Sequence, residues 1–199
     1  MGNNNETGNE VVYDKQQELL LYLKDIVFFF VITILVFLMC FRIVVVEGDS
    51  MYDTLIDGDY LILTSNLLSS EPKAGDIVVV SKESFDNGNP IVKRVIAVEG
   101  QTVDIDFEKG IVYVDGVAID EPYIHTATTN NGGTSFPLTV REGCIFVMGD
   151  NRGRSRDSRY PELGQIDTRE VLGKAFLIAF PGNDEGALER DFSRIGAIS

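Results

Sequence analysis

The sequence predicts a mainly β protein in which an N-terminal membrane-spanning helix precedes an all-β domain. Two observations lead to this fold class. A single uncharged apolar run lies near the N-terminus, and short β-branched segments punctuated by Gly and Asp recur through the rest of the 199 residues. Apolar residues make up 44% of the chain, which is enough for a packed core and excludes a largely disordered protein. The segment pattern is typical of antiparallel sheets in a sandwich or barrel-like arrangement.

The apolar run covers residues 26–41, with one polar residue and no charge. At about 1.5 Å per residue it spans roughly 24 Å, somewhat less than a bilayer core of about 30 Å. Lys24 and Arg42 can extend to the membrane interfaces on either side. We therefore expect an N-terminal tail at 1–24 and a transmembrane anchor at 25–43. The ordinary alternative, a buried core helix, would need a polar face that the run lacks.

Two features favour a retained anchor over a cleaved signal. The segment before the run is acidic, with two lysines against five carboxylates, and no small-x-small site follows the run.

Residues 44–199 form the predicted β-rich domain. We expect strands at 60–63, 77–80, 91–98, 102–107, 111–114, 117–119, 144–148 and 171–180. Asp115-Gly116 separates two of these segments and predicts a two-residue hairpin turn, because Gly readily supplies the positive φ that such turns require. A polar, Gly-rich stretch at about 125–139 predicts a long surface loop.

Charge and residue counts exclude several classes of function. A net charge of −14 argues against a nucleic-acid partner, because phosphate binding needs a surplus of cations. The single histidine, His125, excludes His-rich zinc sites, and any Ser-His-Asp triad would depend on it alone. No metal-ligand spacing and no phosphate loop occurs, so we expect neither a metal nor a cofactor. Cys40 and Cys144 are expected to be free thiols, since the anchor separates them.

Three polar segments carry the residues best suited to chemistry. Ser50 follows the anchor, Lys93 lies near the start of the 91–98 strand, and residues 149–159 are dense in polar groups. Taken singly, each has an ordinary interpretation as a turn serine, an edge-strand lysine or a solvated loop. Together with the Gly-Asp-Ile-Val-Val sequence at 75–79, and in this order after an anchor, they resemble the bacterial type I signal peptidases (leader peptidases). The resemblance extends from the anchor to about Phe180 and is strongest to single-anchor Gram-positive members.

The resemblance implies a protease in which Ser50 is the nucleophile and Lys93 the general base. Ser155 would hold the lysine amine by a hydrogen bond, and Asp157 would be a structural carboxylate paired with Arg159 or Arg94. A lysine base must be neutral, and an unperturbed lysine with a pKa of about 10.4 is almost never neutral near pH 7. The apolar neighbours of Lys93 in its strand predict the burial that would lower this pKa.

One position agrees with the Gram-positive members, and two features depart from the family pattern. Gly48 stands where Gram-negative members have a serine that helps to bind the oxyanion, so the backbone N–H of Ser50 would need a second donor from Gly48 or elsewhere. Asp53 replaces the usual proline after the Ser-Met-x triplet. The last motif is unusually basic, and its arginines are expected to face anionic lipid headgroups or solvent. These arginines are Arg152, Arg154, Arg156 and Arg159.

The resemblance also implies a substrate and a location. Secretory preproteins would be cleaved after small residues in an Ala-x-Ala pattern, with the substrate added as an extended strand. By position, six apolar residues either line the pockets for its side chains or simply pack in the core: Val44, Val46, Met51, Leu55, Ile91 and Val92. Ser50 lies eight residues past Arg42, so at about 3.6 Å per residue it stays within roughly 29 Å of the anchor's end, close to membrane lipid.

We therefore expect a single-pass cell-membrane monomer with its catalytic domain on the extracytoplasmic side. Two alternatives remain. One is a relative with another Ser-Lys task, such as the self-cleavage of phage-type repressors, which the anchor and the lack of a DNA-binding region disfavour. The other is a non-catalytic membrane-tethered binding or assembly module, which the joint presence of Ser50, Lys93 and Ser155 disfavours.

Overall fold

The computed structural model describes residues 15–65, 71–183 and 189–198, which fall into two compact units. The first unit, up to Leu38, is the apolar part of one long helix, and the second, from Met39 onward, is built from strands. The elements are α1 (Lys15–Cys40), β1 (Phe41–Val45), β2 (Tyr60–Ser65), β3 (Ile77–Val80), η1 (Asp86–Gly88), β4 (Ile91–Val98), β5 (Thr102–Asp106), β6 (Ile111–Val114), β7 (Val117–Ala118), β8 (Leu138–Thr139), β9 (Cys144–Met148), β10 (Ile166–Asp167), η2 (Thr168–Glu170), β11 (Val171–Phe180), η3 (Phe192–Arg194) and β12 (Gly196–Ala197). This confirms the predicted mainly β fold with one N-terminal apolar helix.

Helix α1 is long and apolar enough to cross a membrane. Its span Gln17–Cys40 has 24 residues and a mean hydropathy of 2.5, and none of the span is buried against the protein. A helix that exposes apolar side chains on every face is unfavourable in water and suits a lipid environment. The helix ends at Cys40, and Phe41 begins β1. The sequence analysis did not predict this strand, because its apolar residues continue the run of the helix.

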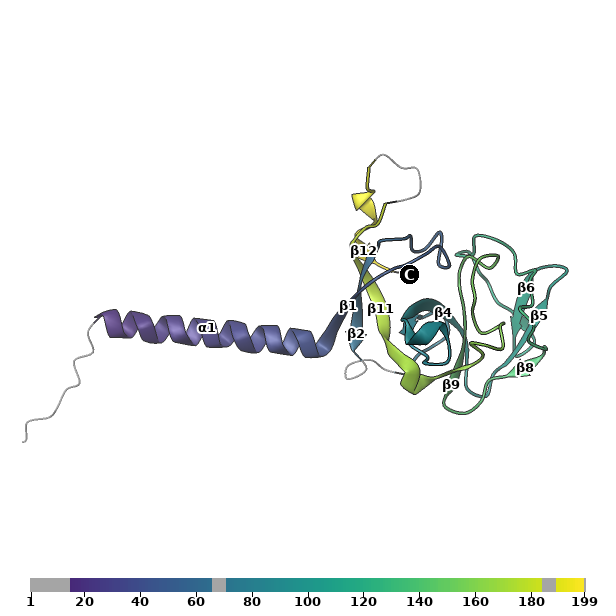
Figure 1. The fold of residues 1–199 in the computed structure, drawn as a ribbon, viewed down its shortest axis with the longest axis horizontal. Helices are drawn as coiled ribbons and strands as arrows, with labels where there is room; N and C mark the ends of the chain where they lie inside the picture. The colour runs from purple at the N-terminus through teal and green to yellow at the C-terminus, as the bar shows by residue number, and fades with distance from the viewer. Residues whose placement is uncertain (1–14, 66–70, 184–188, 199) are drawn as a thin grey trace, which may run out of the picture. The chain divides into compact units, whose positions relative to one another are not determined.

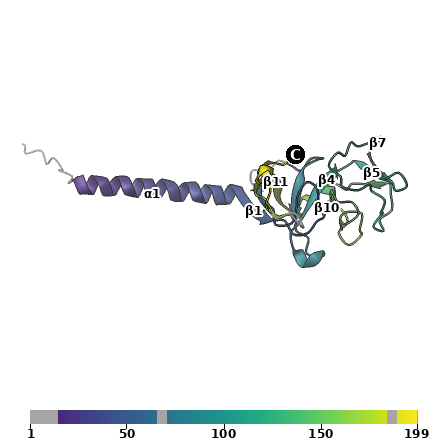
Figure 2. The same cartoon turned by 90° about the horizontal axis from the view of Figure 1, so that it is seen from above.

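The larger sheet is antiparallel and has the strand order β1-β2-β11-β3-β4-β9-β10, with β12 paired to β11. Figures 1 and 2 show its strands curling around the domain, with β1, β2 and β11 at one end and β4 and β9 near the middle. Strand β11 is 10 residues long and pairs with β2 on one edge and β3 on the other. Among the described strands, β11 alone connects the β1–β2 pair to the rest of the larger sheet by hydrogen bonds.

The smaller sheet lies at the opposite end of the domain, with the order β7-β6-β5-β8 (Figure 1). Its inward side chains pack with those of β9 in a separate apolar cluster that includes Val103, Val112 and Phe146. Strands β6 and β7 form the predicted hairpin. Asp115 and Gly116 both have positive φ, 52° and 77°, as the two-residue turn requires.

Most predicted strands are present with nearly the predicted bounds. The two-residue strands β8, β10 and β12 were not predicted, because their short segments carry no alternation of apolar and polar residues.

The polar stretch between β7 and β8 is fastened to the domain. Arg152 donates to Thr128 Oγ1 at 2.6 Å, and Arg159 donates to the Asn130 carbonyl at 3.0 Å. Gly132 packs so closely on the backbone of Arg159 that a Cβ there would lie 2.7 Å from its carbonyl oxygen. The loop is thus part of the packing around residues 149–159.

Replacement of Gly116 by Ala tests the hairpin turn. A Cβ at this position meets no atom within 4 Å, so the cost comes from the left-handed backbone alone. We expect the free energy of unfolding to fall by about 1 kcal/mol in a denaturant titration. Val117→Ala, at the exposed neighbouring residue, is the control and should change it by less than about 0.5 kcal/mol. Equal effects of the two substitutions would contradict the assigned turn.

Candidate active site

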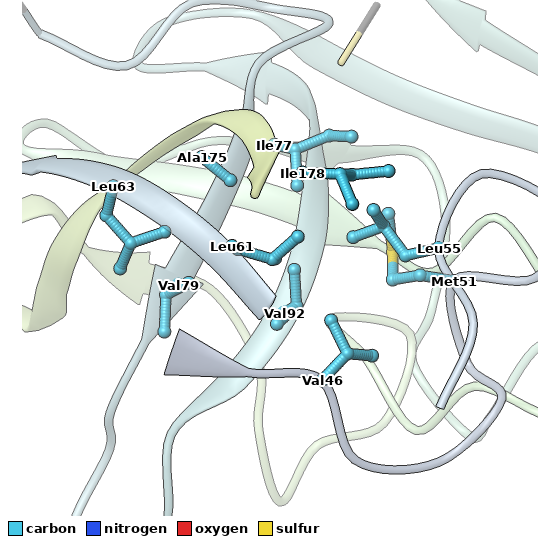
Figure 3. Packing of buried hydrophobic residues seen from close by; sticks show 10 residues of the cluster. All are labelled: Val46, Met51, Leu55, Leu61, Leu63, Ile77, Val79, Val92, Ala175 and Ile178. Atoms are coloured by element: carbon cyan, nitrogen blue, oxygen red, sulfur yellow. The ribbon is translucent and has the colours of Figure 1, made fainter. Parts of the chain in front are cut away.

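Ser50 lies in a tight segment that connects β1 to β2. The segment is closed at its base by two backbone hydrogen bonds, from Val46 N to the Asp59 carbonyl at 2.8 Å and from Gly58 N to the Val46 carbonyl at 2.9 Å. Met51 and Leu55 are fully buried and point into the main apolar cluster beside Ile178 of β11 (Figure 3). These two buried side chains hold the Ser50 segment against the sheet. Ser50 itself is half-buried.

Lys93 reaches Ser50 from the middle of the larger sheet. It lies on β4 opposite Val78 of β3, and its side chain is buried at 3% exposure. The Nζ atom is 2.8 Å from Ser50 Oγ and 2.9 Å from the Val92 carbonyl oxygen. Residues 43 positions apart are thus brought into hydrogen-bond contact by the pairing of strands.

Burial changes the protonation of this lysine. Removal of the amine from water lowers the pKa of Lys93 from 10.5 to about 8, although the carboxylates of Asp157 and Asp150 act in the opposite direction. At pH 7.4 roughly a fifth of the molecules then carry a neutral amine, against about one in a thousand for a solvated lysine. A neutral amine next to a serine hydroxyl can accept its proton.

Arg94, the next residue on β4, points away from this site and makes a buried ion pair. Its guanidinium donates to both carboxylate oxygens of Asp150, from Nε at 2.9 Å and from Nη2 at 2.8 Å. Asp150 also accepts a hydrogen bond from Thr54 Oγ1 at 2.5 Å. Because Thr54 belongs to the Ser50 segment, this carboxylate connects that segment to β4.

Residues 149–159 form the other wall of the site and hold the Ser50 segment by its backbone. Asn151 donates its N–H to the Ser50 carbonyl at 3.0 Å and its side-chain amide to the Asp49 carbonyl at 3.1 Å. Gly149 is in closer contact still: a Cβ there would lie 2.4 Å from the Ser50 carbonyl oxygen and 2.3 Å from Ser155 Oγ. Only glycine fits between the two serines.

Asp157 is paired with Arg159 rather than Arg94. Arg159 Nε and Nη2 donate to its two oxygens at 2.8 and 2.9 Å, and Gly149 N donates to Oδ2 at 3.0 Å. Both side chains are completely buried. The pair fixes the path of the chain on either side of Ser155.

The arginines of this segment do not share one environment. Arg152 and Arg159 are buried, with Arg152 paired to Glu121, so the expectation that all four face lipid or solvent is wrong for these two. Arg154 and Arg156 are exposed and pair with Asp49 and Glu162. The buried pairs explain why a segment so rich in charge is well packed.

Ser155 is buried beside Gly149, but its hydroxyl has no hydrogen-bond partner within the part of the chain that the structure describes. The hydrogen bond from Ser155 to the Lys93 amine therefore stays a prediction. Gly48 N–H donates to Asp57 Oδ1 at 2.7 Å, which directs this donor away from a substrate carbonyl. The part of Gly48 in binding the oxyanion stays a prediction.

The six residues proposed for substrate pockets occupy the core side of the site. Val46, Met51, Leu55 and Val92 are buried in one cluster, and Val44 packs against it (Figure 3). Ile91 packs against a second cluster. Their part in substrate binding stays a prediction.

A cavity of about 870 Å³ is lined by residues that precede and follow Ser50 in the sequence. Its lining includes Asp49, Tyr52, Asp57, His125 and Arg154. His125 Nδ1 lies 3.1 Å from Asp53 Oδ2, and the His125 ring contacts that of Tyr52 edge-on. This contact between His125 and Asp53 was not predicted, because the two residues are 72 positions apart and no local pattern relates them.

Cys40 and Cys144 are both free, as expected. No group of three or more potential metal ligands occurs among residues 15–65, 71–183 and 189–198.

A serine beside a buried lysine points to the class of serine peptidases that use lysine in place of histidine. Comparison with known proteins supports the broader class of serine peptidases. The family described as "Signal peptidase, peptidase S26" matches residues 19–180, and the chain belongs to this family.

Curated relatives include a signal peptidase I of Bacillus licheniformis, 34% identical over 179 residues that cover 86% of this chain and 94% of the relative. Signal peptidase I T of Bacillus subtilis is 34% identical and covers 81% of this chain and 85% of the relative. A solved structure of a signal peptidase I from Enterococcus faecalis is 33% identical, with a TM-score of 0.43, and covers 53% of this chain and 97% of that chain.

Membership of this family supports a serine peptidase that removes signal peptides and has preproteins as substrates. Together with helix α1, it indicates a membrane-anchored protein.

The lowered pKa of Lys93 predicts how stability depends on pH. Between pH 8 and 10.5 the unfolded chain holds a proton on this lysine that the folded protein has released, so folding becomes more favourable as pH rises through this range. Below pH 8 the folded protein bears the full cost of a buried ammonium. Relative to a Lys93→Met variant, the wild-type free energy of unfolding should increase by up to about 3 kcal/mol from pH 8 to 10.5.

Urea titrations of both proteins at several pH values measure this difference. A constant difference would show that Lys93 has an ordinary pKa.

Proposed function

We propose that this protein is a membrane-anchored serine endopeptidase that removes N-terminal signal peptides from translocated preproteins by a Ser50–Lys93 mechanism. The observation that carries the proposal is the 2.8 Å contact between Ser50 Oγ and a buried Lys93 Nζ with a pKa of about 8. The non-catalytic alternative gives no reason to keep an amine in so costly an environment.

The reaction divides into two steps that share one base. Ser50 Oγ attacks the scissile carbonyl while neutral Lys93 accepts the hydroxyl proton, and the backbone N–H of Ser50 stabilises the oxyanion. The lysine ammonium then gives its proton to the leaving amine, which departs as the N-terminus of the mature protein. In the second step Lys93 takes a proton from a water molecule, which attacks the acyl carbonyl. The ester bond to Ser50 Oγ breaks, the lysine ammonium returns its proton to that oxygen, and the signal peptide leaves with a free carboxylate.

Ser155 and Asp157 would support the arrangement of Ser50 and Lys93. The buried Ser155 hydroxyl is available to form a hydrogen bond that orients the Lys93 amine. The Asp157–Arg159 pair keeps the Ser155 backbone in place. Asp157 also keeps the pKa of Lys93 from falling further.

Substrate selection rests on the apolar residues next to Ser50. An extended peptide places alternate side chains on one face, so residues before the scissile bond would contact the cluster around Val46, Met51 and Val92. The tight packing of this cluster favours small side chains, in keeping with cleavage after an Ala-x-Ala pattern.

The proposal includes attachment of the protein to the cell membrane. Helix α1 would anchor a monomer by a single pass, with the β domain on the extracytoplasmic side where signal peptides emerge. Exposed apolar side chains on neighbouring strands β1, β2 and β11 support contact with lipid close to the anchor. These side chains are Ile43, Val45, Tyr60 and Phe180.

Single substitutions at the two central residues test the mechanism. Ser50→Ala removes the nucleophile and Lys93→Ala removes the base, and each should lower cleavage of an Ala-x-Ala signal-peptide substrate in detergent by at least about 10³-fold. Lys109→Ala, an exposed lysine paired with Asp106, is the matched control and should retain wild-type activity. If Lys93→Ala keeps most of its activity, another group is the base. If the wild-type protein cleaves no substrate, the result favours the non-catalytic binding module over the peptidase.

The pH dependence of the reaction tests the same base independently. Only the neutral amine accepts the Ser50 proton, so kcat/KM should rise about tenfold per pH unit below pH 8 and level off above it. The folded fraction, followed by circular dichroism across the range, is the control for loss of structure. A rate that falls as pH rises through 8 is incompatible with Lys93 as the base.

A further inference from the structure

The described C-terminal residues 189–198 lie beyond the part of the chain that matches the family, which ends at residue 180. They return along β11. Strand β12 pairs with Leu177 and Ile178, and Ile198 N donates to the Phe176 carbonyl at 3.0 Å (Figure 1). Ile178 in turn packs in the cluster that holds Met51 and Leu55 (Figure 3). The segment is therefore fixed against the strand on which the Ser50 turn rests.

Arg194, in η3, reaches from this segment to the base of the Ser50 segment. Its Nη1 and Nη2 atoms each lie 2.8 Å from an oxygen of Asp59, whose side chain is completely buried. The same carboxylate accepts hydrogen bonds from Ile56 N at 2.9 Å and Gly182 N at 2.7 Å. Asp59 thus joins the end of the Ser50 segment to the C-terminal part of the chain, and Arg194 is the charge that neutralises it.

A second contact of Arg194 goes to the turn itself. Its Nη2 donates to the Thr54 carbonyl at 3.3 Å, while the Thr54 hydroxyl donates to Asp150 on the far side. Asp150 is paired with Arg94, the neighbour of Lys93. Thr54 is therefore held between two ion pairs: the partly buried Arg194–Asp59 pair and the buried Arg94–Asp150 pair on the strand that carries Lys93.

We propose that Arg194 is a positioning residue for Ser50, acting through Asp59 and Thr54; the proposal rests on the Ser50–Lys93 function above. The guanidinium holds the end of the turn that lies opposite Asn151, so that the Ser50 hydroxyl stays within hydrogen-bond distance of the lysine amine. Reactivity depends steeply on such distances, and a shift of about 1 Å can cost 10²-fold in rate. Arginine suits this role because its planar fork meets both Asp59 oxygens while it also donates to a carbonyl.

The test compares three variants of the full chain. Arg194→Met removes all of the contacts, whereas Arg194→Lys keeps a positive charge but cannot meet both Asp59 oxygens and Thr54 at once. Arg169→Met is the matched control, since Arg169 forms a similar two-pronged pair with Asp167 on the exposed surface. For each variant, kcat and KM for a signal-peptide substrate are measured at a temperature below its own melting transition and divided by the folded fraction.

We expect Arg194→Met to lower kcat by at least about tenfold with KM within twofold of wild type, and Arg194→Lys to give an intermediate loss. The inflexion of the kcat–pH profile should also move above 8 in both, because a loosened turn admits water to Lys93. Arg169→Met should match wild type in all three measures. A purely structural role would lower the melting temperature and leave kcat per folded molecule and the inflexion unchanged.

The outcomes separate this proposal from the proposed function. If Ser50→Ala is inactive but both Arg194 variants cleave within twofold of wild type per folded molecule, the positioning role is overturned and the mechanism stands. If Ser50→Ala cleaves normally, both fail. Should Arg194→Met not fold because Asp59 is left as a buried unpaired charge, Arg194→Lys decides the question.

Discussion

The site depends on the burial of one amine. Lys93 lies in the interior of a β-sheet, where an ammonium is poorly solvated, and its contact with Ser50 Oγ depends on the same packing. The surrounding apolar side chains thus have two effects: they hold the Ser50 turn through Met51 and Leu55, and they lower the pKa of the lysine. A more solvated site would make a more stable protein in which the amine is rarely neutral near pH 7.

Buried ion pairs compensate for this unfavourable environment by fixing the loops around it. Arg94–Asp150, Arg159–Asp157 and Arg194–Asp59 each have a fully buried carboxylate. The first and third pairs join segments that are distant in the sequence, and the second lies within residues 149–159. These ion pairs hold the geometry of the site, whereas Lys93 is the group that changes protonation in the proposed reaction.

Much of this arrangement could be predicted from the sequence. The strands were visible as β-branched segments, and the Asp115-Gly116 turn follows from local backbone chemistry. The proximity of Ser50 and Lys93 came from resemblance to a family, since no local rule relates residues 43 positions apart. Strand β1 was missed because its composition continues that of the helix. The burial of Arg152 and Arg159 was missed because Glu121 and Asn130, which they contact, are distant in the sequence.

The central place of β11 has a consequence for the order of assembly. The hairpin that carries Ser50 and the strands that include Lys93 are linked in the ladder only through β11 among the described strands, and β11 is the last long strand to be synthesised. A nascent chain that ends before residue 171 contains both residues but has no strand to join them. Non-local pairing of this kind forms late and slowly. Ser50 and Lys93 would then come into contact only after most of the chain has been synthesised.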